Sequence, residues 1–285
     1  MMNVLSTEMN GLCSAPAIDE RRIMYYINCV GDMKAVTDTG TLLWSKNLGS
    51  DYVFTGYNMI TPAIANDKTI YVCAGGSIYA FHSRNGDVKW SFSDSNKMNC
   101  MSVTVGLDNL IIAIGKSDAK YSGFNAFTNA GVFLWNTKNM FQSISSNSNT
   151  NGPNIVIGEN GTIISSSSRG FVGAIARSGT SLWYKNISDN GDCINCYNAG
   201  VSYDPVTNTV YATGENSQYL WAINGATGNV IWQCLIAASS TSPAVGTLGI
   251  YTGNQPPSCI IYNILMLSST ILLLSSFLSS FYRSC

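Results

Sequence analysis

Short segments rich in β-branched and aromatic residues, separated by polar turns, run along most of the chain. Examples are Ile23–Ile27, Thr69–Val72 and Leu110–Ile114. Strand-forming residues in short runs, turn residues at fixed offsets and the lack of a helical period are typical of β-structure. The pattern therefore predicts an all-β protein.

A second pattern occurs five times and sets the period of the chain. In each copy an apolar segment leads to a turn that ends in glycine, and a tryptophan follows four residues after that glycine. The tryptophans are 46, 45, 48 and 49 residues apart. The five pairs are Gly40 with Trp44, Gly86 with Trp90, Gly131 with Trp135, Gly179 with Trp183 and Gly228 with Trp232. A fixed period of this length indicates an array of structural repeats.

Each repeat also contains two earlier strands. In the second repeat, Thr61–Ile64 precede a polar turn at Asn66–Lys68 and the strand Thr69–Val72. Four antiparallel strands per repeat follow from this order. A single four-stranded sheet leaves both faces in water, whereas sheets arranged radially cover one another, with tryptophan as the joint between them. We therefore predict a β-propeller.

The fifth repeat contains Ala222, Asn224, Thr227, Gly228 and Trp232. It resembles the pyrroloquinoline-quinone-type repeat of the quinoprotein β-propellers, whose motif is Ala-x-Asp-x-x-Thr-Gly-x-x-x-Trp. The resemblance extends over residues 15–253. It implies five complete blades of four antiparallel strands and an incomplete sixth, because Ser242–Val245 and Gly249–Gly253 are followed by no sixth Gly-x-x-x-Trp.

Three regions follow from these patterns: an N-terminal segment at residues 1–12, propeller repeats at 13–257 and a hydrophobic C-terminal tail at 258–285. The N-terminal segment has neither the positive region nor the apolar region of a secretory signal. A fragment of a longer propeller with seven or eight blades is one further interpretation.

Residues 259–281 contain no charged side chain and are long enough to span a bilayer. Three interpretations stay open: a C-terminal membrane anchor, a false reading frame after a truncated propeller, and a buried strand pair that completes the sixth blade. The first predicts a membrane location and membrane contact through 259–281. A cytoplasmic location, or a secretory one if the natural N-terminus is missing, is the alternative.

The composition argues against two classes of function, nucleic-acid binding and catalysis by a His-dependent triad. Only 11% of the residues are charged and the net charge is −1, so the chain lacks the basic surface that nucleic acid requires. His82 is the only histidine, which argues against a His-dependent triad. It occupies the Asp place of the repeat motif, where we expect a turn-side hydrogen bond.

The nine cysteines do not form a regular disulfide framework. We expect Cys29 and Cys73, which lie in predicted strands, to behave as small buried apolar residues. Cys193-Ile-Asn-Cys196 favours a local disulfide or free thiols over metal or redox chemistry. The redox compartment stays open, and the sequons at Asn160 and Asn186 matter only if the protein is secreted.

The loops between the last strand of one blade and the first strand of the next gather at one mouth of a propeller, where ligands generally bind. The binding-face candidates in these loops are Tyr52, Phe54, Tyr57, Phe141, Cys193, Cys196 and Tyr197. The alternative is that these side chains only cap blade edges. We expect a protein or small-ligand partner at this mouth.

Two functions stay open from the sequence. One is a non-catalytic binding or scaffold propeller, with no catalytic, cofactor or metal residues. The other is a degenerate or fragmentary quinoprotein dehydrogenase that acts on an alcohol or sugar. Quinoproteins that use the cofactor carry adjacent cysteines against the quinone and a calcium ion beside it. No Cys-Cys dipeptide is present here, so neither quinone nor calcium is expected.

Overall fold

The computed structural model describes most of the repeat region. The described residues are 15–28, 30–48, 61–74, 76–93, 100–115, 123–137, 154–166, 170–187, 200–214, 217–236, 242–246, 249–252 and 260–262. In these residues no helix has the length and apolar character needed to cross a membrane.

The described strands form five antiparallel sheets of four strands and one of three, each built from consecutive strands. We call these sheets blades one to six. Blade one contains β1 (Ala17–Ile18), β2 (Met24–Ile27), β3 (Asp32–Val36) and β4 (Leu42–Asn47); blade two contains β5 (Ala63–Ile64), β6 (Thr69–Ala74), β7 (Ser77–His82) and β8 (Val88–Phe92). Blade three contains β9 (Cys100–Val105), β10 (Ile111–Gly115), β11 (Gly123–Phe127) and β12 (Phe133–Thr137); blade four contains β13 (Ile155–Ile157), β14 (Ile163–Ser166), β15 (Phe171–Ile175) and β16 (Ser181–Asn186). Blade five contains β17 (Gly200–Asp204), β18 (Thr209–Gly214), β19 (Ser217–Asn224) and β20 (Val230–Leu235); blade six contains β21 (Ala244–Gly246), β22 (Gly249–Tyr251) and β23 (Ile260–Tyr262).

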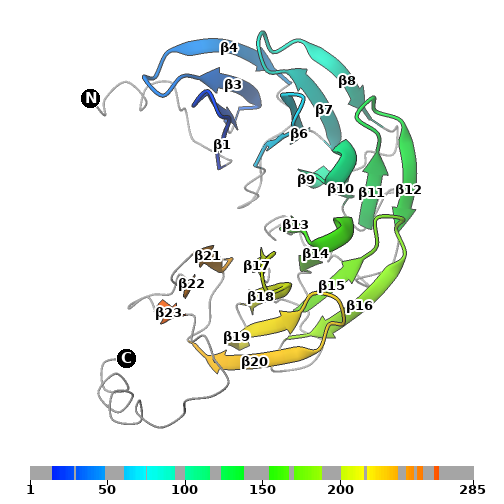
Figure 1. Ribbon diagram of the computed structural model, residues 1–285. Coiled ribbons are helices and arrows are strands. Elements are labelled where there is room, and N and C mark those ends of the chain that lie inside the picture. Colours follow the sequence, from blue (N-terminus) through cyan, green and yellow to red (C-terminus); the bar gives the residue numbers. More distant parts are fainter. Residues whose placement is uncertain are drawn as a thin grey trace.

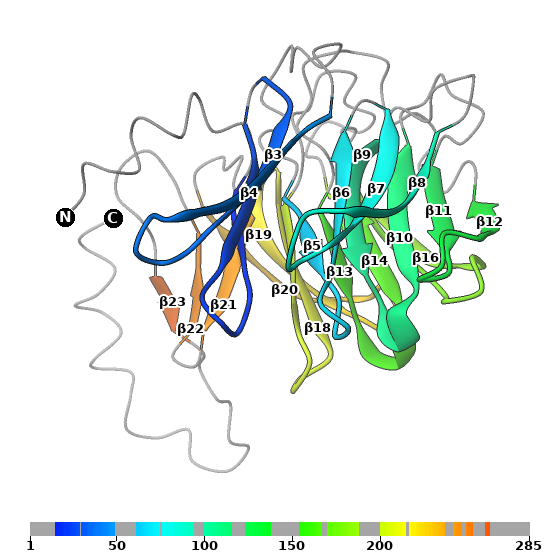
Figure 2. The same cartoon turned by 90° about the horizontal axis from the view of Figure 1, so that it is seen from above.

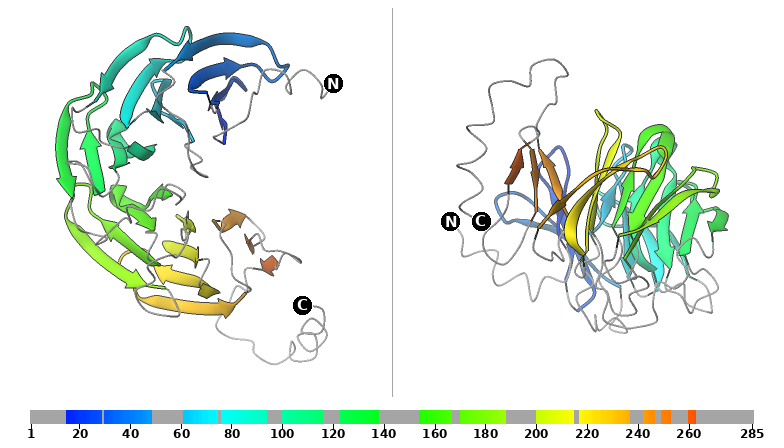
Figure 3. Two further views of the ribbon diagram at one scale, coloured as in Figure 1. Left: turned by 180° about the vertical axis from the view of Figure 1, so that it is seen from behind. Right: turned by 90° about the horizontal axis from the view of Figure 1, so that it is seen from below.

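The blades stand side by side around an open arc; in the four-stranded blades the first strand lies toward the centre and the fourth strand on the outside (Figure 1). Seen from behind, blades one and six lie on either side of the opening (Figure 3, left), and in the view from above both lie toward the same side of the molecule (Figure 2). The predicted all-β propeller with five complete blades is confirmed. Residues 260–262 from the hydrophobic tail pair with β22 as the third strand of blade six.

The core lies between neighbouring blades. All residues of the second strands β6, β10, β14 and β18 are buried. The largest cluster joins blades one, two and three, and Tyr25, Tyr71, Phe81 and Phe127 contribute its large rings. Stability therefore depends on contacts between adjacent repeats, as in other repeat proteins.

The Gly-x-x-x-Trp pattern forms the joints between blades. Trp44 of blade one packs on the last turn of blade two, where its Nε1 donates a hydrogen bond to the Ser83 carbonyl oxygen at 2.9 Å. Gly86 in that turn has φ of +70°, and a Cβ there would lie 2.5 Å from Trp44 Cε3. Glycine is required because a side chain would collide with the indole. Trp90 packs likewise on Gly131, Trp135 on Gly179 and Trp183 on Gly228.

Four of the five motif tryptophans thus contact the glycine of the next repeat, and the glycine and tryptophan of one motif belong to two different joints. The prediction that tryptophan joins the blades is confirmed. Polar contacts between turns accompany these joints, on the face of the arc where first and second strands connect. They are Glu20 with Lys68 at 2.8 Å, Asp108 with Arg177 at 2.6 Å, and Glu159 with Asn208 at 2.9 Å.

Candidate functional site

The two faces of the arc differ in the connections that they carry. The turns between first and second strands, and between third and fourth strands, lie on one face, which we call the turn face. The strand ends that lead into the remaining connections lie on the opposite face, which we call the mouth face. The first strands begin there, so the blade-to-blade loops of the sequence prediction enter from this face.

All seven binding-face candidates from the sequence lie outside the described residues, so they stay predictions. They are Tyr52, Phe54, Tyr57, Phe141, Cys193, Cys196 and Tyr197. The structure instead describes the strand ends that frame them. Several of these ends carry buried polar side chains, which the sequence analysis did not identify.

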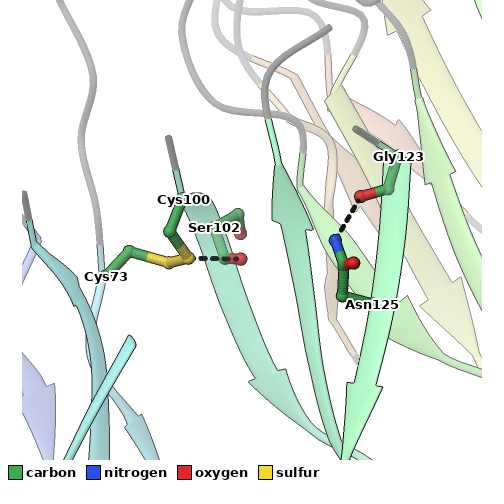
Figure 4. The surroundings of a disulfide bond; sticks show 5 residues. All are labelled: Cys73, Cys100, Ser102, Gly123 and Asn125. Carbon is green, nitrogen blue, oxygen red and sulfur yellow. Dashed lines mark hydrogen bonds between the residues drawn. A yellow bond between two sulfur atoms is a disulfide. The ribbon is translucent and has the colours of Figure 1, made fainter. Parts of the chain in front are cut away.

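In blade three, a buried amide fixes the mouth-face end of two strands. Asn125 of β11 has no exposed surface, and its Nδ2 donates a hydrogen bond to the Gly123 carbonyl oxygen at 3.0 Å (Figure 4). Its Oδ1 accepts a hydrogen bond from Asn136 Nδ2 of β12 at 2.9 Å. A buried amide is stable only when it is paired in this way, so these bonds hold the edge of the blade in one conformation.

Polar groups of blades four, five and six meet at the inner side of the mouth face. The Ser165 hydroxyl is fully buried and donates to the Asn154 carbonyl oxygen at 2.7 Å. The Asn154 side chain in turn donates to the Ser242 hydroxyl, and the Ser202 hydroxyl donates to the Pro243 carbonyl oxygen. The starts of β13, β17 and β21 are therefore linked through amide and hydroxyl groups.

In blade one, the turn between β2 and β3 is closed by side chains. Asn28 Oδ1 accepts hydrogen bonds from the backbone N–H groups of Val30 at 3.1 Å and Asp32 at 2.8 Å. The Asp32 carboxylate accepts from Asn28 Nδ2 at 3.1 Å and from Asn47 Nδ2 at 2.7 Å. Asp32 is thus paired with amides in a structural turn.

A disulfide bond joins Cys73 and Cys100 (Figure 4), with the two Cα atoms 5.3 Å apart. Cys73 is near the mouth-face end of β6, and Cys100 begins β9 in the next blade. The expectation that Cys73 is a simple buried apolar residue is therefore wrong. Strands β6 and β9 are neighbours across a blade interface, so cysteines 27 residues apart in the sequence come together. The signal in the sequence was that Cys73 lies near the end of a second strand and Cys100 at the start of the next repeat's first strand, both at the mouth face.

The single histidine lies on the turn face, away from the mouth. The His82 N–H donates to the Asp87 carbonyl oxygen at 2.8 Å, and the His82 carbonyl oxygen accepts from the Gly86 N–H at 2.9 Å. The turn of blade two is therefore closed through the backbone of His82, and a hydrogen bond of its imidazole stays a prediction.

The buried phenol Tyr71 does not supply a base in place of this histidine. Burial, with the nearby charge of Asp67, raises the pKa of Tyr71 to about 12. Its hydroxyl therefore stays protonated at neutral pH.

The absence of quinone and calcium, expected from the sequence, stays a prediction. Within the described part of the chain no three or more His, Cys, Asp or Glu side chains form a group that could hold a metal ion. The full sequence has no adjacent cysteine pair to lie against a quinone. The mouth-face groups named above are amides, hydroxyls, the amide-paired Asp32 carboxylate and one disulfide.

Comparison with known families agrees with the repeat geometry. The family model described as "Outer membrane protein assembly factor BamB" matches residues 9–234, which is most of the chain. The chain belongs to this family. The resemblance to pyrroloquinoline-quinone-type repeats is confirmed by the match to BamB. No curated protein sequence matches the chain.

Solved structures show the same fold at low sequence identity. BamB from Moraxella catarrhalis is 13% identical with a TM-score of 0.58, and the match covers 84% of this chain and 65% of that one. Selenomethionine-substituted virginiamycin B lyase from Staphylococcus aureus is 12% identical with a TM-score of 0.62, over 87% and 79% of the two chains. A catalytically inactive form of that lyase with quinupristin gives 12% and 0.61, over 84% and 76%. This chain therefore spans just under two thirds of the BamB structure's length.

Proposed function

We propose that this protein is a non-catalytic binding or scaffold propeller that holds a partner at the mouth face. One observation carries the proposal: the strand ends from which the blade-to-blade loops start are fixed by buried polar groups and a disulfide. Asn125, Ser165 and the Cys73–Cys100 bond each fix a different part of this edge. Loops on a rigid frame are the usual site of recognition in such folds.

A protein partner is the class we favour. The name of the BamB relative describes an assembly factor, which acts on other proteins. The mouth-face groups named above are mostly hydrogen-bonding amides and hydroxyls, the Asp32 carboxylate is paired with two amides, and the chain has a net charge of only −1. Such a surface recognises a partner through shape and neutral hydrogen bonds, without strong electrostatic attraction.

Tethering to a membrane through the C-terminal segment is a second, separate part of the proposal. Strand β23 takes up Ile260–Tyr262, which leaves residues 263–281 for a tether. These 19 uncharged residues (263 to 281 inclusive) approach the roughly 20 that a spanning helix needs. Extraction of membranes with alkaline carbonate tests it: a tethered protein stays in the pellet, whereas release of the full-length chain into the supernatant contradicts tethering.

A position-specific photocrosslinker tests the binding face. It is placed in the full chain at Asn154 on the mouth face or, as the control, at Val206, which is 91% exposed on the turn face. We expect a discrete crosslinked partner from position 154 and none from position 206, as determined by mass spectrometry. The same crosslinks from both positions would contradict a mouth-face site.

The enzyme alternative has its own test. Calorimetry with pyrroloquinoline quinone and calcium is expected to show no binding, and a dye-linked assay with alcohols and sugars is expected to show no oxidation. Turnover in that assay would contradict the non-catalytic proposal even if the crosslinks are found.

A further inference from the structure

One sequence motif that the proposed function does not use lies on the turn face. Asn160-Gly161-Thr162 is an acceptor sequon for N-linked oligosaccharide. Asn160 lies in the 3-10 turn η2 (Glu159–Gly161), which connects β13 to β14. An exposed turn is where a bulky glycan can be accommodated without disturbing a sheet.

The neighbours of Asn160 are held while its own side chain is exposed. The Glu159 N–H donates to Tyr203 Oη at 3.0 Å, and the Thr162 N–H donates to the Glu159 carbonyl oxygen at 3.0 Å. Asn160 itself has φ of +55° at the tip of the turn, and its amide makes no hydrogen bond among the described residues. The amide nitrogen is therefore presented to solvent by a fixed turn.

The disulfide supplies an independent observation about the compartment. Cys73 is completely buried and Cys100 is 7% exposed, so their bond is a structural crosslink between two blades. The cytosol keeps thiols reduced, and structural disulfides persist in the secretory pathway, outside the cell and in the bacterial periplasm. The first two of these are compartments in which an Asn-x-Ser/Thr sequon is used.

We propose that Asn160 carries an N-linked oligosaccharide. The donor class is an oligosaccharide linked to a lipid pyrophosphate. In the transfer, the bond between the first sugar carbon and the donor phosphate oxygen breaks, and a bond from that carbon to Asn160 Nδ2 forms. The amide nitrogen loses one proton, and the lipid pyrophosphate is the leaving group.

The second sequon, Asn186-Ile187-Ser188, provides a contrast within the same chain. Asn186 is the last residue of β16 and is only partly exposed. Ile187 is 1% exposed and packs in the hydrophobic cluster between blades four and five. A glycan on Asn186 would be crowded against this packed edge, so we expect Asn160 to be the occupied site.

The test uses the full-length protein purified from its own cells. Peptide N-glycosidase in heavy-oxygen water converts a glycosylated asparagine to a labelled aspartate, which mass spectrometry locates. We expect the label at Asn160 and not at Asn186. In the same cells, Thr162→Ser preserves the sequon and should retain the glycosidase-sensitive shift in gel mobility, whereas Thr162→Ala and Asn160→Gln should lose it completely.

A variant that misfolds can also lose its glycan, so a substitution in a matched turn is the control. Asn109→Gln alters the corresponding turn of blade three, which has no sequon, and should leave the mobility shift unchanged. The proposal is overturned if the Asn160 peptide of the mature protein is found only unmodified. It is also overturned if Cys73 and Cys100 are alkylated without prior reduction, because the compartment argument then fails.

Discussion

Asp19 shows how one carboxylate organises a turn of blade one. Its side chain is only 2% exposed and pairs with Arg21 at 2.7 Å. It also accepts hydrogen bonds from the Ile23 N–H at 3.0 Å and from Tyr25 Oη at 3.1 Å. Burial acts to raise the pKa of Asp19, but these donors outweigh it and the pKa is lowered. The ionised form is therefore the one that the fold stabilises.

Replacing this carboxylate tests that conclusion. We expect Asp19→Asn to lower the free energy of unfolding by about 1–3 kcal/mol at pH 7, because an amide cannot satisfy three donors. A lowered folded pKa gives stability that is present above the unfolded value near 3.9 and is lost as the pH falls through the folded value. The difference from wild type should therefore shrink below about pH 4 in urea titrations.

A surface carboxylate provides the control for this change. Asp38 is 52% exposed in its side chain and lies 3.7 Å from Arg22. Asp38→Asn should change the free energy of unfolding by less than about 0.5 kcal/mol. An equal loss in both variants would mean that the buried hydrogen bonds of Asp19 contribute nothing specific.

Substitutions at two glycines distinguish the free-energy cost of a left-handed backbone from the cost of a clash with tryptophan. Gly40 and Gly228 have φ of +87° and +73°, but only Gly228 lies against an indole among the described residues. Gly40→Ala should cost about 1–2 kcal/mol for the left-handed conformation alone. Gly228→Ala should cost about 1–3 kcal/mol more, because its Cβ would lie 2.7 Å from Trp183 Cδ2. Urea unfolding measures both, and equal losses would contradict the joint.

At the scale of elements, the disulfide connects blades two and three. We expect Cys73→Ser or Cys100→Ser to lower the free energy of unfolding by about 3–4 kcal/mol, from the chain entropy of a loop that spans 27 residues. Cys234 is a free, exposed cysteine, so Cys234→Ser should leave stability unchanged. Denaturant titrations with and without reductant measure this. If the free energy of unfolding of the wild-type protein is the same with and without reductant, the crosslink is contradicted.

The elements themselves were predictable from the sequence, but their contacts were not. The period of the Gly-x-x-x-Trp pattern identified the blades, because each copy contains the same strand and turn residues. It did not show that Trp44 contacts Gly86, because the sequence of one repeat does not identify the residues that it contacts in the next. The Cys73–Cys100 pair was missed for the same reason: it forms across a blade interface.

The predicted binding-face residues lie outside the described part of the chain and stay predictions, and the groups that frame their loops were not predicted. Loop aromatics such as Tyr52 and Phe141 follow from the positions of loops in a propeller. The buried amides and hydroxyls that frame these loops had no signal in the sequence, because Asn125 and Ser165 are indistinguishable there from exposed polar residues. Their burial depends on the packing of neighbouring strands, which only the three-dimensional structure provides.

In the whole molecule, the stability of each blade depends on its position in the open arc. Blades two to five are each flanked by a neighbour on both sides, whereas blades one and six lie beside the opening (Figure 1). Blade six has only three described strands, and among its buried residues Ile250 packs on the core of blade five. In a repeat array, the free energy of each unit is the sum of its own contribution and those of its interfaces. An end blade should therefore open more readily than a central one.

Hydrogen exchange of corresponding strands tests this gradient. Strands β10 and β22 are both the second strand of a blade, so their place within the sheet is matched. We expect amides of β22 to exchange at least about tenfold faster than those of β10, which corresponds to about 1.4 kcal/mol less free energy of opening. Equal protection, measured by mass spectrometry on the full-length protein, would mean that blade six is covered as completely as the central blades. The opening in the arc would then be closed in solution, and the mouth face would surround a complete channel.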